Sequence, residues 1–309
     1  MLVAVIAVLL MAAPGPDMIV VRPDQPVAAL VEDRPVALGL RTGSIDRINL
    51  NAATVARLGL KPAGLMGKVS LKIGRTRIMD GRNRPVGYAV GGRTAKGRVI
   101  WFDGLDGPHD GTIGPFAFPQ ARIAVELGGG GGQAHAFPLA GAIDTAGYTP
   151  VERGSAEGNP DGRWGFGLSF GVEHDYRLPL ASAATGAALL AELGGTVTDE
   201  VWDEEILLGV TRPVRRVVLA RPLEIGPFRL TEIAVRVRDR RDAMGAGDAL
   251  PEPPRPDDDP AEIVVTGRQQ GGMRPIYTLE IGRPVLAACR SITFDKAARQ
   301  ILLDCPPAS

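Results

Sequence analysis

Short runs in which hydrophobic and polar residues alternate recur along the whole chain, with glycine, proline and other turn residues between them. Such alternation is typical of half-buried β-strands. The strands predicted in the first half are 35–40, 68–74, 85–90, 98–102 and 122–127. Those predicted in the second half are 166–172, 214–220, 222–228, 232–238, 277–282, 291–295 and 300–304. Only the alanine-rich stretches 51–59 and 182–195 favour helix. The pattern predicts an all-β protein with one short helix in each half.

The two halves repeat one order of elements. In each, a strand leads into a polar loop, an alanine-rich helix ending in Leu-Gly follows, and further strands close the half. A glycine-rich stretch at 126–133 and a polar stretch at 154–162 separate them and predict a flexible connection. The expected units are a first lobe at 21–140, a linker at 141–163, and a second lobe at 164–309 with a disordered insertion at 240–262.

Composition narrows the class of protein. Hydrophobic residues make up 45% of the chain and charged residues 23%, which fits a soluble globular protein. Lysine plus arginine and aspartate plus glutamate number 35 each, so no overall field would attract nucleic acid. Nucleic-acid binding is therefore excluded as a leading function.

The N-terminal segment 1–20 is an apolar run followed by small residues and proline, which indicates a signal peptide. It lacks the usual basic residues at its start, so an uncleaved anchor or a misassigned start codon stays open. The run is short for a membrane span, and no other segment could form one in the mature chain. We expect a periplasmic or secreted protein.

The two cysteines favour the same compartment. Cys289 and Cys305 flank the predicted hairpin 291–304, and pairing Ile292 with Leu302 would place the cysteines opposite each other. The expected disulfide belongs in an oxidising compartment. Two free thiols remain the alternative.

The most informative segment follows the strand 35–40. The strand runs into Arg41-Thr42-Gly43-Ser44, and an alanine-rich helix comes after a short loop. The segment resembles the active-site loop of pepsin-like and retropepsin-like aspartic peptidases, in which a strand ends in Asp-Thr-Gly. Arg41 stands where that family has its aspartate. The resemblance implies a two-lobed acid-protease-like barrel fold with one short helix per lobe, in which two aspartates share a proton and activate water.

Two further segments resemble the stretch that passes behind each active-site loop in this family and braces it. In the first half it is HDGTIG, with Asp110, Gly111, Ile113 and Gly114. In the second half it is TLEIG, with Ile281 and Gly282. Residues 81–97 occupy the region of the family's substrate-covering hairpin.

The second half contains no Asp-Thr-Gly at the corresponding place. Aligning its FGVE on LGLR puts Glu173 opposite Arg41, whereas a shift of two residues puts Asp175 there. The first alignment predicts an ion pair between Arg41 and Glu173 where the family has its aspartates. Asp144, in Asp-Thr-Ala-Gly, is a weaker candidate acid, because a surface turn explains it as well.

These residues predict an aspartic-peptidase-like protein without activity, because a guanidinium stays protonated and cannot act as a general base. It would bind extended peptide in the cleft between the lobes. One alternative is an active endopeptidase that uses Asp144 or Asp175. Another is an envelope interaction module docking through 250–270, where EIVVTGR resembles a segment of TonB-dependent receptors.

No cofactor or metal is expected. His109, His135 and His174 lack metal-ligand spacing to one another or to cysteine, and isolated histidines of this kind are interpreted as surface or capping residues. The expected partner is a peptide or an envelope protein.

Overall fold

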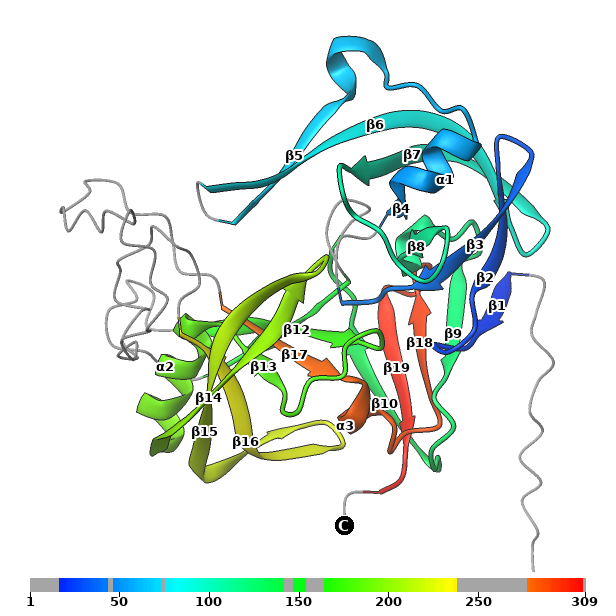
Figure 1. Ribbon diagram of the computed structural model, residues 1–309. Helices are drawn as coiled ribbons and strands as arrows, with labels where there is room; N and C mark the ends of the chain where they lie inside the picture. The colour runs from blue at the N-terminus through cyan, green and yellow to red at the C-terminus, as the bar shows by residue number, and fades with distance from the viewer. Residues whose placement is uncertain are drawn as a thin grey trace, which may run out of the picture.

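The computed structural model describes residues 17–43, 47–73, 76–141, 147–153, 164–237 and 277–307. The predicted insertion 240–262, the docking segment 250–270, Ser44 and Asp144 lie outside these residues. Within them the protein is mostly β, with a closed six-stranded barrel and further sheets, as the alternating pattern predicts (Figure 1). No helix in this part of the chain has the length and apolar character that crossing a membrane requires.

The first half forms a seven-stranded sheet in the order β2-β3-β8-β4-β7-β6-β5, and pairing of β2 with β6 closes the barrel. Its strands are β2 (Val27–Val31), β3 (Arg34–Leu40), β4 (Ile48–Leu50), β5 (Lys68–Ile73), β6 (Thr76–Val90), β7 (Arg93–Phe102) and β8 (Gly111–Ile113). The helix α1 (Ala52–Arg57) and the 3-10 turns η1 (Gly64–Gly67) and η2 (Pro115–Ala117) complete it.

The second half repeats this order strand for strand as β11-β12-β17-β13-β16-β15-β14. Its strands are β11 (Thr149–Glu152), β12 (Gly165–Gly171), β13 (Leu180–Ala181), β14 (Gly195–Leu207), β15 (Val210–Ile225), β16 (Phe228–Arg236) and β17 (Thr278–Gly282). Helix α2 (Ala183–Leu193) matches α1, and a short α3 (Arg283–Leu286) follows β17. The duplication inferred from sequence is thus present in the topology.

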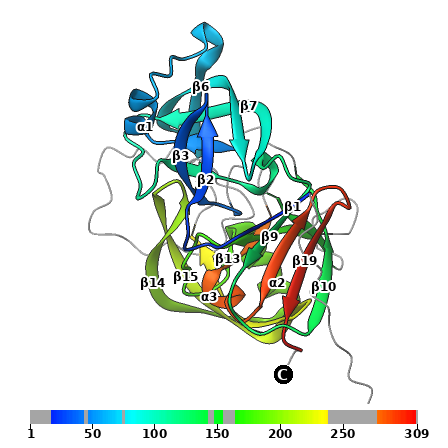
Figure 2. The ribbon, with the colours of Figure 1, turned by 90° about the vertical axis from the view of Figure 1, so that its right-hand side faces the viewer.

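A five-stranded sheet joins the halves in the order β1-β9-β18-β19-β10 (Figure 2). It contains β1 (Met18–Val21), β9 (Arg122–Glu126), β10 (Gln133–Pro138), β18 (Ser291–Asp295) and β19 (Gln300–Cys305). β9 and β18 occupy equivalent places in the two halves, and they pair with each other in this sheet. Ile123 pairs with Phe294 and Val125 with Ile292, so the pairing is the same when the two halves are exchanged. A local twofold relation therefore runs through this sheet.

Three expected boundaries are corrected. The predicted N-terminal segment 1–20 overlaps β1, which pairs with β9 in the central sheet. The predicted linker 141–163 contains β11, the outer strand of the second sheet. The glycine run 128–132 is packed rather than loose, because Gly129 and Gly130 donate hydrogen bonds to the carbonyls of Cys289 and Ala288.

Cys289 and Cys305 form the expected disulfide, although the predicted register of the hairpin is wrong by one residue. Ile292 pairs with Leu303 rather than Leu302. Asp295 pairs with Gln300 at the end of the hairpin, and Arg299, with a φ of 54°, belongs to the turn between them.

Candidate functional site

The loops that follow β3 and β12 meet where the two halves face each other. In each half this strand pairs in parallel with the strand behind it, Leu40 with Ile113 and Phe170 with Ile281. Because Ile113-Gly114 and Ile281-Gly282 occupy the same place in the repeat, the residue equivalent to Arg41 is Gly171. The alignment of Glu173 with Arg41 is therefore wrong by two residues, and Glu173 corresponds to Gly43.

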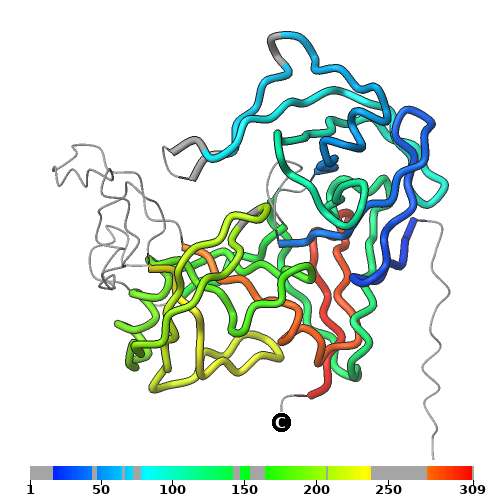
Figure 3. The backbone as a smooth tube through the Cα atoms, in the orientation of Figure 1, coloured from blue at the N-terminus to red at the C-terminus, as the bar shows by residue number. Residues whose placement is uncertain are grey.

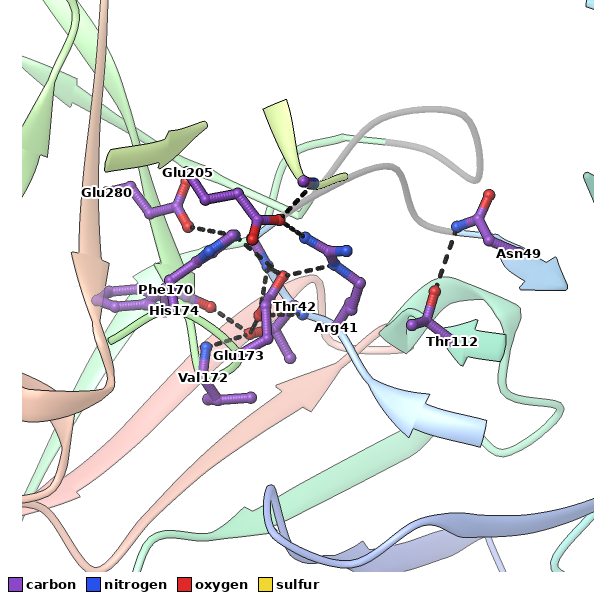
Figure 4. A network of polar contacts seen from close by, with 12 residues as sticks. Arg41, Thr42, Asn49, Thr112, Phe170, Val172, Glu173, His174, Glu205 and Glu280 are labelled. Atoms are coloured by element: carbon purple, nitrogen blue, oxygen red, sulfur yellow. Dashed lines mark hydrogen bonds and ion pairs between the residues drawn. The ribbon is translucent and has the colours of Figure 1, made fainter. Parts of the chain in front are cut away.

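Thr42 ties the first half to the second. Its side chain is 1% exposed, and its hydroxyl donates to the carbonyl of Phe170. The same oxygen accepts a hydrogen bond from the Val172 N–H at 3.0 Å (Figure 4). A buried hydroxyl that both donates to and accepts from the opposite strand fixes the distance between the two loops.

The carboxylate of Glu173 lies against the Arg41-Thr42-Gly43 loop. It accepts the N–H of Thr42 at 2.9 Å and that of Gly43 at 3.1 Å, and its Oε1 is 3.5 Å from the Arg41 Nε. This is the ion pair that the sequence predicts, formed from a different register. The two side chains are only 13% and 10% exposed, so the pair is largely shielded from water.

Arg41 binds a second carboxylate that the sequence analysis missed. Its Nη2 is 3.2 Å from Oε1 of Glu205, which also accepts the N–H of Gly209 at 2.8 Å (Figure 4). Burial opposes ionisation of Glu205, but the Gly209 N–H and the Arg41 charge outweigh it and lower the pKa of Glu205. No motif marks Glu205, which lies in a strand rich in acidic residues.

His174 is buried beside this ion pair, not at the surface as its isolation in the sequence suggested. It is 4% exposed, and its ring stacks on Tyr176 with the centroids 4.7 Å apart. Its Nε2 lies 3.6 Å from Oε1 of Glu173 and from Oε1 of Glu280. Burial, with a smaller contribution from the Arg41 charge, lowers the pKa of His174, so the neutral imidazole is favoured.

Glu280 contributes a third carboxyl group. Burial and the negative charge of Glu173 raise its pKa well above the ordinary value, so it keeps its proton where other carboxyls have lost theirs. Its Oε1 fits between two glycines: a Cβ would lie 2.1 Å from this atom at Gly171 and 2.2 Å at Gly43. The glycine at the position equivalent to Arg41 thus makes room for this acid. We call Arg41, Glu173, His174, Glu205 and Glu280 the Arg41 cluster.

The bracing residues predicted in the first half hold the loop from behind. Asp110 accepts the N–H of Ala37 on β3 at 2.9 Å, the hydroxyl of Thr54 at 3.0 Å and the guanidinium of Arg57 at 2.6 Å. Burial opposes ionisation of Asp110, but these hydrogen bonds outweigh it and lower its pKa. Asp110 therefore links β3, β8 and α1.

The other predicted bracing residues of both halves lie on β8 and β17 or directly after these strands. Gly111 and Ile113 lie on β8 and Ile281 on β17, and both isoleucines are fully buried. Gly114 and Gly282 precede η2 and α3, the short helical turns after each bracing strand.

Two further expectations are corrected. Asp175 lies away from the Arg41 cluster, because its carboxylate is 64% exposed and forms an ion pair with Arg283. The 81–97 segment is the β6–β7 hairpin, and its turn at Gly91 packs against Ile19 and Gln120 rather than over the cluster.

The hairpin that does cover the cluster is β14–β15 of the second half. Leu208 at its turn and Val210 pack with Leu71 and Phe102 of the first half. Figure 3 shows the β5–β6 hairpin projecting from the first half towards the second. Glu205 therefore reaches Arg41 from a hairpin anchored on the opposite half.

No protein-family model matches the chain, and no curated protein matches it.

Proposed function

We propose that the protein is an acid-protease-like protein without peptidase activity that binds an extended peptide between its halves. The observation that carries the proposal is the pair of residues at the equivalent strand ends, Arg41 and Gly171. Neither side chain can act as an acid or a base at ordinary pH, because the guanidinium stays protonated and glycine has no ionisable group.

The nearest carboxylates are already engaged. Glu173 accepts two backbone N–H groups and faces Arg41, and Glu205 is held by Arg41 and the Gly209 N–H. Removing a proton from water requires a carboxylate that can turn to the water with a free lone pair. The cluster is better suited to holding the two halves together than to activating water.

Peptide binding is supported by the cavity beside the cluster. It has a volume of about 560 Å³, and Gly43 of the first half and Ile206 of β14 both line it. Since β14 is the outer strand of its sheet among the described residues, its outer edge offers backbone groups to an extended chain. A peptide could pair with this edge and place side chains in the cavity.

The disulfide supports an exported protein. The Cys289–Cys305 bond is typical of oxidising compartments, and the apolar N-terminal sequence indicates export. We include a periplasmic or secreted location in the proposal.

The first test is a peptidase assay of the purified protein with unstructured polypeptide substrates at acid and neutral pH. We expect no cleavage above that of a buffer control. Cleavage blocked by a pepstatin-type inhibitor and lost in Glu173→Gln would overturn the proposal.

One observation favours a second function, hydrolysis by a displaced pair of acids. Glu173 and the protonated Glu280 both approach the Nε2 of His174, and a carboxylate beside a carboxylic acid is the arrangement that activates water in acid proteases. The same assay decides between the two, because this function requires activity that Glu280→Gln removes.

A further inference from the structure

The cavity beside the Arg41 cluster has a distinct set of polar groups on the face of the second sheet. Ser169 of β12, Thr278 and Glu280 of β17, and Arg236 of β16 line it together with the ring of Tyr277. Of the described residues that line it, Arg236 is the one cation and Glu280 the one acid. We propose that this cavity binds a carboxylate group of the ligand, held between the guanidinium of Arg236 and the carboxyl group of Glu280.

The inference rests on the proposed function, because it names the chemical group by which the bound peptide or another organic acid is recognised. A carboxylate occurs at a peptide C-terminus, on an acidic side chain and in a small organic acid. The experiment below separates these sources.

The protonation state of Glu280 decides whether the cavity accepts an anion or a cation. Its Oε1 is buried and has no hydrogen-bond partner among the described residues, so an ionised Glu280 would be poorly stabilised. Burial and the neighbouring Glu173 raise its pKa, which favours the protonated form. A protonated carboxyl group donates a hydrogen bond, and Arg236 is then the one charged side chain among the described lining residues.

The groups around Glu280 agree with this assignment. Glu173 and Glu205 both face Arg41, which balances much of their charge. His174 has a lowered pKa and adds no positive charge at neutral pH. Arg236 lies close enough to oppose the rise in the pKa of Glu280. An entering cation would meet Arg236 and would require Glu280 to ionise beside Glu173, whereas a carboxylate meets a guanidinium and a hydrogen-bond donor.

The remaining lining supplies donors and space. Thr278 lines the same cavity, whereas the hydroxyl of Ser169 bonds the carboxyl group of Glu280 and that of Ser182 accepts the N–H groups of Thr185 and Thr278. Along β12, Gly165 and Gly167 alternate with the buried Phe166 and Leu168, and the ring of Tyr148 packs over Gly167 at the edge of the cavity. A carboxylate with an apolar neighbour fits this combination.

The test is isothermal titration calorimetry of the full-length protein with four ligands. They are a short apolar peptide with a free C-terminus, its C-terminal amide, the amide with one internal glutamate, and N-acetylphenylalanine. We expect the free acid to bind at least about tenfold more tightly than the amide, a difference of about 1.4 kcal/mol. Recovery of affinity by the internal glutamate would identify an acidic side chain as the source.

Two variants test the residues. Arg236→Gln should remove the preference for acid over amide. In the wild type, affinity for the acid should fall as pH rises through the raised pKa of Glu280, because ionised Glu280 repels the ligand. Glu280→Gln keeps a donor but cannot ionise, so it should not show this fall.

The outcomes separate the two proposals. Equal binding of acid and amide overturns the carboxylate site but leaves peptide binding standing. Binding of N-acetylphenylalanine without binding of any of the three peptides supports the site and overturns peptide binding. No binding by any of the four ligands overturns both.

Discussion

Arg41 connects the two halves by charge. Its guanidinium lies between Glu173, which comes from the loop after β12, and Glu205, which comes from the β14–β15 hairpin. Three segments distant in sequence therefore depend on one side chain. An ion pair that is largely removed from water costs little while it is complete, but losing one partner leaves a charge unpaired.

Arg41→Met should therefore lower the free energy of unfolding by about 3 kcal/mol, because Glu173 and Glu205 would lose their shared cation. Urea denaturation followed by circular dichroism measures the change. Arg22→Met is the matched control: its pair with Glu126 has side chains 55% and 48% exposed, and water and salt screen it. Equal effects of the two substitutions would show that the cluster does not contribute to stability.

At this scale the sequence predicted part of the site. Arg41 and Glu173 were identified because Thr42-Gly43 and the strand before them form a recognisable motif. Glu205 lies in a strand without a motif, and Glu280 lies in the bracing segment TLEIG but was not identified, because the roles of both depend on which strands face each other across the halves. The ion pair was reached through an alignment that is wrong by two residues, since nothing local marks Gly171 as the equivalent of Arg41.

Among the elements, β8 lies between β3 and β4, and at Gly111 of β8 there is no room for a side chain. A Cβ on Gly111 would lie 2.1 Å from the carbonyl oxygen of Asn49 and 2.9 Å from the Cα of Leu50. Both obstacles are backbone atoms of a paired strand, so they cannot rotate away. The glycine of the bracing segment is thus required by strand packing, whatever the function of the site.

Gly111→Ala should destabilise the protein by about 3 kcal/mol, because β4 must move away from β8. Gly87→Ala is the control, since this exposed strand glycine has no atom within 4 Å of an added Cβ. Thermal unfolding measures both. A Gly111→Ala variant as stable as Gly87→Ala would contradict the close approach of the strands.

Sequence patterns predicted the elements unevenly. Strands with regular alternation, such as β3, β9, β18 and β19, were found with small errors at their ends. β14 was missed because the segment 199–205 carries five acidic residues, which mask its alternation. The predicted strand 222–228 crosses the turn at Gly226, where a φ of 54° separates β15 from β16.

For the whole molecule, the β14–β15 hairpin sets how far the halves can separate. Leu208 is 2% exposed at a turn position with a φ of 45°, and it packs in the apolar cluster with Leu71 and Phe102. Along the hairpin, this contact lies at the turn, beyond Glu205 and farther from the rest of the second sheet. Apolar packing therefore helps to hold Glu205 against Arg41.

Leu208→Asn should release this hairpin, because asparagine tolerates the positive φ but removes the buried apolar side chain. We expect a loss of stability of about 2 kcal/mol. Hydrogen–deuterium exchange should increase in 201–212. Leu30→Asn, at a leucine that is 40% exposed, should leave exchange in that hairpin unchanged. Unaltered exchange in Leu208→Asn would show that the hairpin is held by other contacts.

The twofold pairing of β9 with β18 resembles that of a symmetric dimer, but here both halves belong to one chain and can differ in sequence. In a dimer of identical halves, each position near the axis would occur twice, and Arg41 would face a second arginine. Covalent linkage of the halves frees each position from its counterpart, so arginine can stand at one strand end and glycine at the other. The cluster of one cation and three acidic side chains is an asymmetric arrangement that a symmetric pair of subunits could not build.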